Sequence, residues 1–150
     1  MREHPDHHDA ELLLRLYDLR REAKLREARE WFTRDFRAES YADLLARYPR
    51  GSEDNARFRM VVSYWDMVAS IVNHGLIKEE FFFENTTEFW VVWEKTKPVV
   101  AEGREARKNP YIWSNLETLA AKYEQWTNRR APEALQALRK IVVEGTSPAR

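Results

Sequence analysis

The sequence predicts an all-α fold: an antiparallel helical bundle of three to four long helices plus short connecting helices. Apolar residues recur every three or four positions along most of the chain, as in amphipathic helices. Only four glycines occur in 150 residues, too few for the many turns of a β-sandwich or barrel. Hydrophobic residues make up 43% and charged residues 33%, so the chain is globular rather than disordered.

Composition also limits the classes of function. The 25 basic and 25 acidic residues cancel and are mixed along the chain, which argues against nucleic acid or an anionic membrane as a partner. The absence of cysteine excludes disulfides and thiolate chemistry. No apolar run reaches the roughly 20 residues of a membrane helix and no signal-peptide core is present, so a cytoplasmic protein is predicted. We expect one helical domain over 1–150, with 1–8 and 146–150 as flexible tails.

The first helix is predicted to run from Asp9, which can cap it, to Phe36. If unbroken, these 28 residues would span about 42 Å, longer than a compact domain of this size needs. The middle of the segment is almost entirely polar, whereas apolar patches lie towards both ends. We therefore expect this helix to contact two different surfaces.

Capping residues define the next two helices. Ser40 is predicted to cap a short helix that Pro49 ends, and Ser52 to cap a long one. The long helix carries a wide apolar stripe, typical of a central helix. Gly75 ends it in the C′ position of a Schellman motif, with Leu76 as the expected apolar contact.

The second half of the chain predicts three further helices. The first is capped by Thr86 or Thr87, and Pro98 should bend it without ending it. Its segment EFWVVW also favours a strand, but no turn-bounded partner strand exists, so we prefer a helix. Pro110 should open the next helix, and Pro132 the last one.

Three polar residues on the central helix, Asp66, Ser70 and His74, stand in the order acid, nucleophile, base. Two helical turns separate Asp66 from His74 by about 12 Å, so this aspartate cannot orient the imidazole. No glycine-rich turn offers an oxyanion hole. The geometry therefore argues against catalysis, and we predict no catalytic residue.

The structural interpretation of these polar residues is an ion pair or a polar pocket. A buried carboxylate needs a partner, and we expect Asp66 to pair with Arg104 or Arg107. Asn73 and His74 lie in the last turn of the helix, where they can bond free carbonyls.

Two clusters resemble metal ligands. His4, His7 and His8 lie with Asp6 and Asp9 near the N-terminus, but a solvated tail is the simpler interpretation. Five glutamates suggest a carboxylate-rich bundle, yet no Glu-x-x-His motif for a di-iron site occurs, so a solvated face is expected. These glutamates are Glu79, Glu80, Glu84, Glu88 and Glu94. We predict no metal and no cofactor.

The aromatic content, 13% with six tryptophans, is high. These side chains could fill the core, cover a partner surface or line an apolar ligand pocket, and we favour the core. The tryptophans are Trp31, Trp65, Trp90, Trp93, Trp113 and Trp126.

The leucines of the first helix predict an interface. Leu12, Leu13, Leu16 and Leu19 are separated by a polar span from the apolar residues at the end of the predicted helix. A second copy of the chain could cover them through a two-fold contact, each contributing about 1.5–3 kcal/mol if fully buried. In the competing arrangement the helix bends within the polar span and folds back onto its own bundle, giving a monomer.

The chain resembles uncharacterised bacterial helical proteins of the domain-of-unknown-function kind. The resemblance extends from about Phe58 to Tyr123, and its motifs are YWDMVASIVNHGLI, FFF, FWxxW, KPVV and NPYIWSNLE. It implies an all-helical fold in which the helix ending in GLI packs against a later helix with Trp, Pro and Arg. It implies no assigned activity and carries over no catalytic residues.

Two hypotheses of function follow. The first is a non-enzymatic helical module for protein interaction or structure, as a homodimer or with another protein. The second is a small-ligand-binding bundle or enzyme, with Asp66, Asn73, His74 and Arg104 lining an aromatic pocket. An exposed apolar patch on a packed core would favour the first, and an enclosed polar cavity would favour the second.

Overall fold

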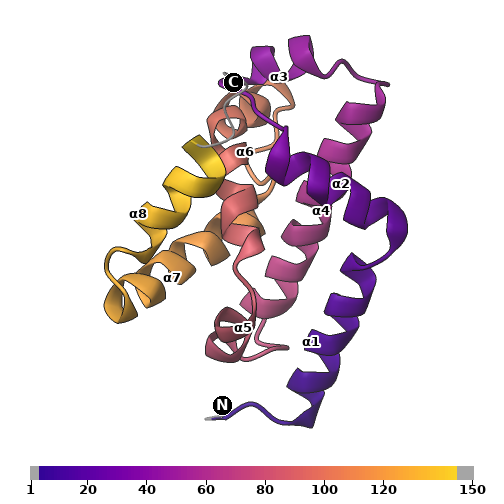
Figure 1. Ribbon diagram of the computed structural model, residues 1–150. Coiled ribbons are helices and arrows are strands. Elements are labelled where there is room, and N and C mark those ends of the chain that lie inside the picture. Colours follow the sequence, from indigo (N-terminus) through magenta and orange to yellow (C-terminus); the bar gives the residue numbers. More distant parts are fainter. Residues whose placement is uncertain (1–3, 145–150) are drawn as a thin grey trace.

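The computed structural model describes residues 4–144, which form eight α-helices, a short π-helical turn and no strand (Figure 1). The all-α prediction is confirmed. The elements are α1 (His7–Arg20), α2 (Ala23–Arg34), α3 (Tyr41–Arg47), α4 (Glu53–Asn73), α5 (Glu79–Asn85), α6 (Glu88–Ala106), α7 (Ser114–Arg130), α8 (Ala134–Arg139) and the π turn Lys140–Glu144. The predicted tail at 146–150 lies outside the described residues.

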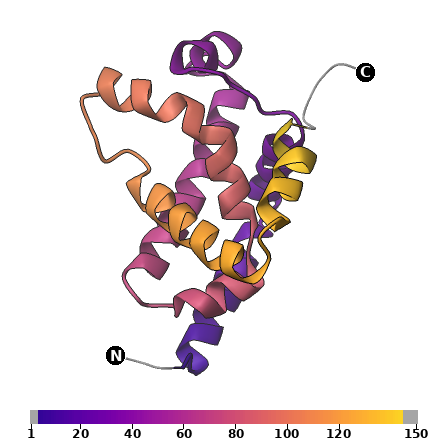
Figure 2. The ribbon, with the colours of Figure 1, turned by 90° about the vertical axis from the view of Figure 1, so that its left-hand side faces the viewer.

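Helix α4 is the centre of the bundle. It packs against α2 and α7, and also contacts α6. In Figure 1, α4 descends and α6 returns upward, so the two run antiparallel. Figure 2 shows α7 crossing below α6, with α8 following it. None of the described helices is both long and apolar enough to cross a membrane.

The segment predicted as one helix from Asp9 to Phe36 forms two helices, so that prediction is wrong. The backbone of Glu22 is extended, with φ -54° and ψ 138°, and its carboxylate accepts a hydrogen bond from the Leu25 amide at 3.0 Å. Arg29 Nη1 donates to the carbonyl of Arg20 at 3.1 Å and satisfies the end of α1. The break lets α1 and α2 run in different directions, and α4 reaches α1 through the bond from the Tyr64 hydroxyl to the Leu16 carbonyl.

The N-terminal end of α1 is also anchored. Asp6, not Asp9, is the N-cap, and the two form a reciprocal capping box. The fully buried carboxylate of Asp9 accepts a hydrogen bond from the Lys78 amide at 2.6 Å. Helix α1 therefore begins at His7, inside the segment predicted as a tail. Among residues 4–144 no group of three His, Cys, Asp or Glu is placed to hold a metal ion.

Local capping predictions hold for α3 and α4. Ser40 Oγ accepts a hydrogen bond from the third amide of α3 at 3.0 Å, and Ser52 Oγ does the same for α4 at 3.2 Å. Gly75 has φ 79° and forms the expected Schellman motif. The predicted apolar contact is wrong by one residue, because Leu76 is 57% exposed whereas Ile77 is fully buried.

The later helix boundaries follow the predictions less closely. Helix α6 begins after Thr87 and continues through Pro98, as predicted. Helix α7 begins at Ser114 rather than at Pro110, so the predicted start is wrong. The residue before it, Trp113, has a left-handed backbone with φ 54° and provides no side-chain cap.

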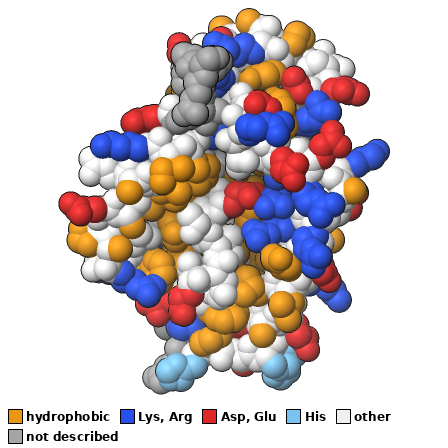
Figure 3. All heavy atoms as spheres, viewed as in Figure 1, with side chains coloured by type: hydrophobic (Ala, Val, Ile, Leu, Met, Phe, Trp, Pro, Cys, Tyr) orange, Lys and Arg blue, Asp and Glu red, His pale blue; other side chains and the backbone are white. Residues whose placement is uncertain are grey.

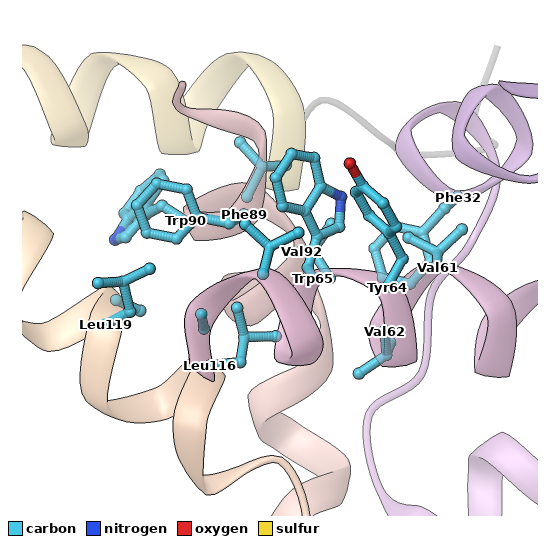
Figure 4. Close-up of a cluster of buried hydrophobic side chains, with 14 of the residues drawn as sticks. Phe32, Val61, Val62, Tyr64, Trp65, Phe89, Trp90, Val92, Leu116 and Leu119 are labelled. Carbon is cyan, nitrogen blue, oxygen red and sulfur yellow. The ribbon is translucent and has the colours of Figure 1, made fainter. Parts of the chain in front are cut away.

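The core lies between α4, α6 and α7 and continues towards α2 (Figure 4). Trp65 and Trp90 are buried among its valines and leucines. Phe89 lies 5.0 Å from the ring of Tyr123 in an edge-to-face arrangement. The other four tryptophans are partly buried and pack against this cluster. The aromatic side chains thus mainly fill the core.

Candidate functional site

The Asp66 carboxylate caps a neighbouring helix. Its Oδ1 accepts a hydrogen bond from the Leu116 amide, in the first turn of α7, at 3.0 Å. Trp113 occupies the N-cap position of α7, but its side chain accepts no hydrogen bond from the helix amides. Asp66, on α4, provides the acceptor that is missing there. A carboxylate at this end also interacts favourably with the helix dipole.

The predicted ion pair of Asp66 with an arginine is therefore replaced by separate interactions. Arg104 donates to Glu117 Oε1 at 2.9 Å and to the carbonyl of Ile112 at 3.0 Å. Arg107 lies at the exposed C-terminal end of α6. The ion pair does not form because α7 starts late, at Ser114, and its first amides rather than an arginine lie next to Asp66.

Asn73 and His74 also have structural partners. Asn73 Nδ2 donates to the carbonyl of Asn115 in α7 at 3.0 Å, not to a carbonyl of its own helix. His74 Nδ1 lies 2.8 Å from the carbonyl of Ser70, in the last turn of α4, as expected. The predicted polar residues thus connect α4 to α7 and complete helix ends.

Replacing Asp66 by alanine should lower the free energy of unfolding by about 1–2 kcal/mol, the usual cost of losing a helix cap. Asp66→Asn keeps an acceptor oxygen and should cost less. Chemical denaturation of both variants measures this difference. A loss above about 3 kcal/mol for Asp66→Ala would instead indicate a stranded buried charge.

Of the glutamates predicted to be solvated, Glu94 is buried and Glu88 is partly buried, which corrects that expectation. Glu88 accepts from Arg29 Nε at 2.7 Å and Nη2 at 2.8 Å, and from Trp65 Nε1 at 3.0 Å. These bonds raise the pKa of Arg29 and join α2, α4 and α6. The side chain of Glu94 is only 2% exposed and pairs with Arg139 at 2.7 Å. The sequence contained a signal for this burial, because both glutamates stand among the apolar residues of α6.

Lys95 is buried in α6 and was not singled out from the sequence. Its Nζ donates to the carbonyls of Phe32 at 2.7 Å and Thr33 at 3.1 Å, at the end of α2. Burial lowers the pKa of Lys95 to about 8. A lysine with a lowered pKa often marks an active site. Here its bonds complete a helix C-terminus, where a cation is favoured.

The stability of the protein should increase with pH because of Lys95. Between pH 8 and the usual lysine pKa of 10.5, the unfolded chain binds this proton more tightly than the folded chain does, so raising the pH favours folding. We expect the free energy of unfolding to rise by about 2 kcal/mol from pH 7 to pH 10. Burial raises the pKa of Tyr64 to about 12, so its contribution to stability is lost only above this window.

Urea denaturation at several pH values measures this rise, and Lys95→Met should remove most of it. A wild type whose stability is constant from pH 7 to pH 10 would contradict the prediction.

An apolar groove of about 270 Å³ lies beside α1, and we call it the α1 groove. Side chains of α1, α4 and α5 line it, including Leu13 and Val68. On its rim, Leu14 is 65% and Tyr17 is 47% exposed. Arg20 lies over the Tyr17 ring at 4.9 Å. In Figure 3, apolar side chains are exposed in the lower half of the view, where α1 lies in Figure 1. A group of Lys and Arg side chains lies next to them.

The predicted interface leucines are divided between the core and the surface. Leu16 is buried, and the Tyr64 hydroxyl donates to its carbonyl at 2.5 Å. Leu12 and Leu13 are partly buried against the core, whereas Leu19 is 49% exposed. One side of α1 therefore contacts the bundle. The exposed rim residues Leu14 and Tyr17 were missed, although three consecutive leucines at 12–14 must occupy more than one face of a helix.

Comparison with known proteins identifies a family. A family model described as "Domain of unknown function (DUF4760)" matches residues 5–126, which extends beyond the segment that carries the predicted resemblance. Comparisons with curated proteins and with solved structures find no match. The matched segment contains α1 to α6 and most of α7, so it includes both the α1 groove and the Asp66 cap. The chain therefore belongs to the DUF4760 family of domains of unknown function.

Proposed function

We propose that this protein is a non-enzymatic helical interaction module that forms a homodimer through the α1 groove. The observation that carries the proposal is the exposed apolar rim formed by Leu14 and Tyr17 beside a mainly apolar groove. Exposed apolar surface next to a hollow is typical of a protein interface.

A second copy of the chain is the partner that fits this surface. Leu14 borders a hollow on each side of α1, so it can insert into the partner's groove while accepting the partner's side chain in return. The second hollow also contains Glu11, Arg15 and Asp18. In an antiparallel two-fold contact of two α1 helices, Arg15 of one copy can approach an acidic residue of the other.

The apolar rim provides energy for association. Each fully buried rim side chain would contribute about 1.5–3 kcal/mol. The two rim side chains, Leu14 and Tyr17, offset part of the roughly 4–15 kcal/mol that association costs. The remaining contacts between the two α1 helices would have to supply the rest for a dissociation constant in the micromolar range, about -8 kcal/mol.

The hypothesis of a ligand pocket around Asp66, Asn73, His74 and Arg104 has less support. Asp66 bonds a helix N-terminus, Asn73 and His74 bond carbonyls, and Arg104 bonds a carbonyl and a glutamate. These partners occupy most of the polar groups that a ligand would need, although the buried Asn73 Oδ1 has no hydrogen-bond partner among the described residues.

Sedimentation equilibrium at about 50 μM, a concentration well above the expected dissociation constant, tests the dimer. Wild type should be dimeric and Leu14→Glu monomeric, because the variant places a charge in the contact without entering the core. Ile141→Glu is the matched control, since Ile141 is 71% exposed but lies at the other end of the chain, and it should remain dimeric. Leu16→Glu is unsuitable because Leu16 is buried in its own bundle.

A monomeric wild type would contradict the proposal. A Leu14→Glu variant that stays dimeric would place the contact elsewhere and contradict it as well.

A further inference from the structure

A second groove, of about 300 Å³, lies between α3, the first turns of α4 and the C-terminal end of α6. Three arginines line it: Arg50, Arg59 and Arg107. Its other side chains are mainly apolar or aromatic, among them Phe58 and Trp113. We call it the arginine groove. Figure 1 shows that α3, which contributes to this groove, lies at the opposite end of the bundle from the start of α1.

We propose that the arginine groove binds a small aromatic anion, a molecule in which a carboxylate or a phosphate is joined through one linking atom to a planar ring. The guanidinium groups would bind the anionic group by paired hydrogen bonds, and the aromatic wall would contact the ring.

The charge distribution supports an anion. No aspartate or glutamate lines the groove. Within residues 4–144, the ion pairs of the structure involve other basic side chains, and Arg50, Arg59 and Arg107 have no carboxylate partner within ion-pair distance. Three like charges that share one groove repel one another, and an anion between them removes that repulsion.

Hydrogen bonds hold two of the arginines in place before a ligand binds. Arg59 Nε donates to Asn55 Oδ1 at 3.0 Å, and the buried Asn55 side chain is itself held by a bond from Nδ2 to the Tyr48 carbonyl at 2.9 Å. Arg50 Nη2 donates to the hydroxyl of Tyr41 at 2.9 Å. The terminal nitrogens of Arg59 remain for an anion. Such preorganisation lowers the entropy cost of binding.

The aromatic wall is also built from specific contacts. The Trp113 ring meets the Phe58 ring edge to face at 5.5 Å, and Trp113 has a left-handed backbone that is uncommon for a non-glycine residue. Backbone strain of this kind gathers at ligand sites. Gly103 allows the Tyr41 ring to approach α6, because a Cβ at Gly103 would lie 3.2 Å from Tyr41 Cδ1.

Isothermal titration calorimetry of the full chain tests the proposal with phenyl phosphate and phenylacetate as probes. We expect saturable binding of at least one of them, with a dissociation constant of about 1 mM or tighter. Inorganic phosphate lacks the aromatic ring and benzyl alcohol lacks the anionic group, so each should bind at least about tenfold more weakly. The stronger of the two probes identifies the anionic group.

Variants locate the site. Arg59→Gln and Arg107→Gln should each weaken binding of the stronger probe by about tenfold or more, the effect of losing one charge-assisted hydrogen bond. Arg129→Gln, on an exposed arginine outside the groove, should bind like wild type. Circular dichroism and thermal melting of each variant verify that the fold is kept. Because α1 is untouched, these variants should not alter the oligomeric state.

Absence of saturable binding of both probes would overturn the proposal. Equal binding by wild type, Arg59→Gln and Arg107→Gln would overturn it as well, since it would place the ligand elsewhere.

Discussion

Glu88→Ala is expected to lower the free energy of unfolding by up to about 3–5 kcal/mol, the cost of leaving a largely buried charge without its partner. Glu88 accepts two hydrogen bonds from Arg29 and one from Trp65, and the side chains of Arg29 and Glu88 are only 17% and 20% exposed. Its removal leaves the guanidinium and the indole N–H largely shielded from water. Chemical denaturation measures the change.

A matched control and a double variant separate this effect from ordinary surface changes. Glu84→Ala, at an exposed glutamate on α5, should change stability by less than about 0.5 kcal/mol. The double variant Arg29→Ala/Glu88→Ala should lose less than the two single variants together, because no charge is then stranded. A Glu88→Ala variant as stable as wild type would show that the bonds of Glu88 contribute little net stability.

The second large effect is expected for Phe89→Ala, with a loss of about 3–5 kcal/mol. The Phe89 ring is fully buried and lies 5.4 Å from the ring of Phe82, 6.0 Å from Phe83 and 5.0 Å from Tyr123. It therefore joins α5, α6 and α7 at one point. An alanine leaves a cavity that three other rings would have to fill by moving.

Thermal and chemical denaturation of Phe89→Ala should be compared with Tyr111→Ala, which removes an aromatic ring that is 76% exposed. The control should lose less than about 0.5 kcal/mol. Phe89→Leu retains more of the buried volume and should fall between the two. An equal loss for Phe89→Ala and Tyr111→Ala would show that the aromatic cluster around Phe89 does not carry the stability assigned to it.

Some elements were predictable because their signals are local. Ser40 and Ser52 cap helices by bonding an amide three residues along, and Gly75 ends α4 through its own left-handed backbone. The break after Arg20 was given only as the competing arrangement, because the polar run has high helix propensity and glutamate is an unusual N-cap. Arg29 can donate to the Arg20 carbonyl, at the end of α1, only after the chain has turned between the two helices. The sequence therefore does not reveal this bond.

The surfaces were harder to predict than the fold. The sequence identified α1 as an apolar element but could not tell which of its leucines faces its own bundle. Leu16 faces inward and Leu14 outward, because side chains two positions apart point to nearly opposite sides of a helix and only the packing of α1 selects between them. The arginine groove gave no sequence signal, since Arg50 and Arg107 are 57 positions apart. Only the contact of α3 with α6 brings them to one place.

The sequence by itself determined that this protein is helical, where α3, α4 and α6 begin and where α4 ends, and that its aromatic residues can fill a core. Spacing and caps decide these features within one or two helical turns. Only the tertiary structure decided that Asp66 caps α7, that Glu88 binds Arg29 and Trp65, and that Lys95 completes α2. The physical reason is that a buried polar group must find a partner wherever packing places one, often more than 20 residues away along the chain.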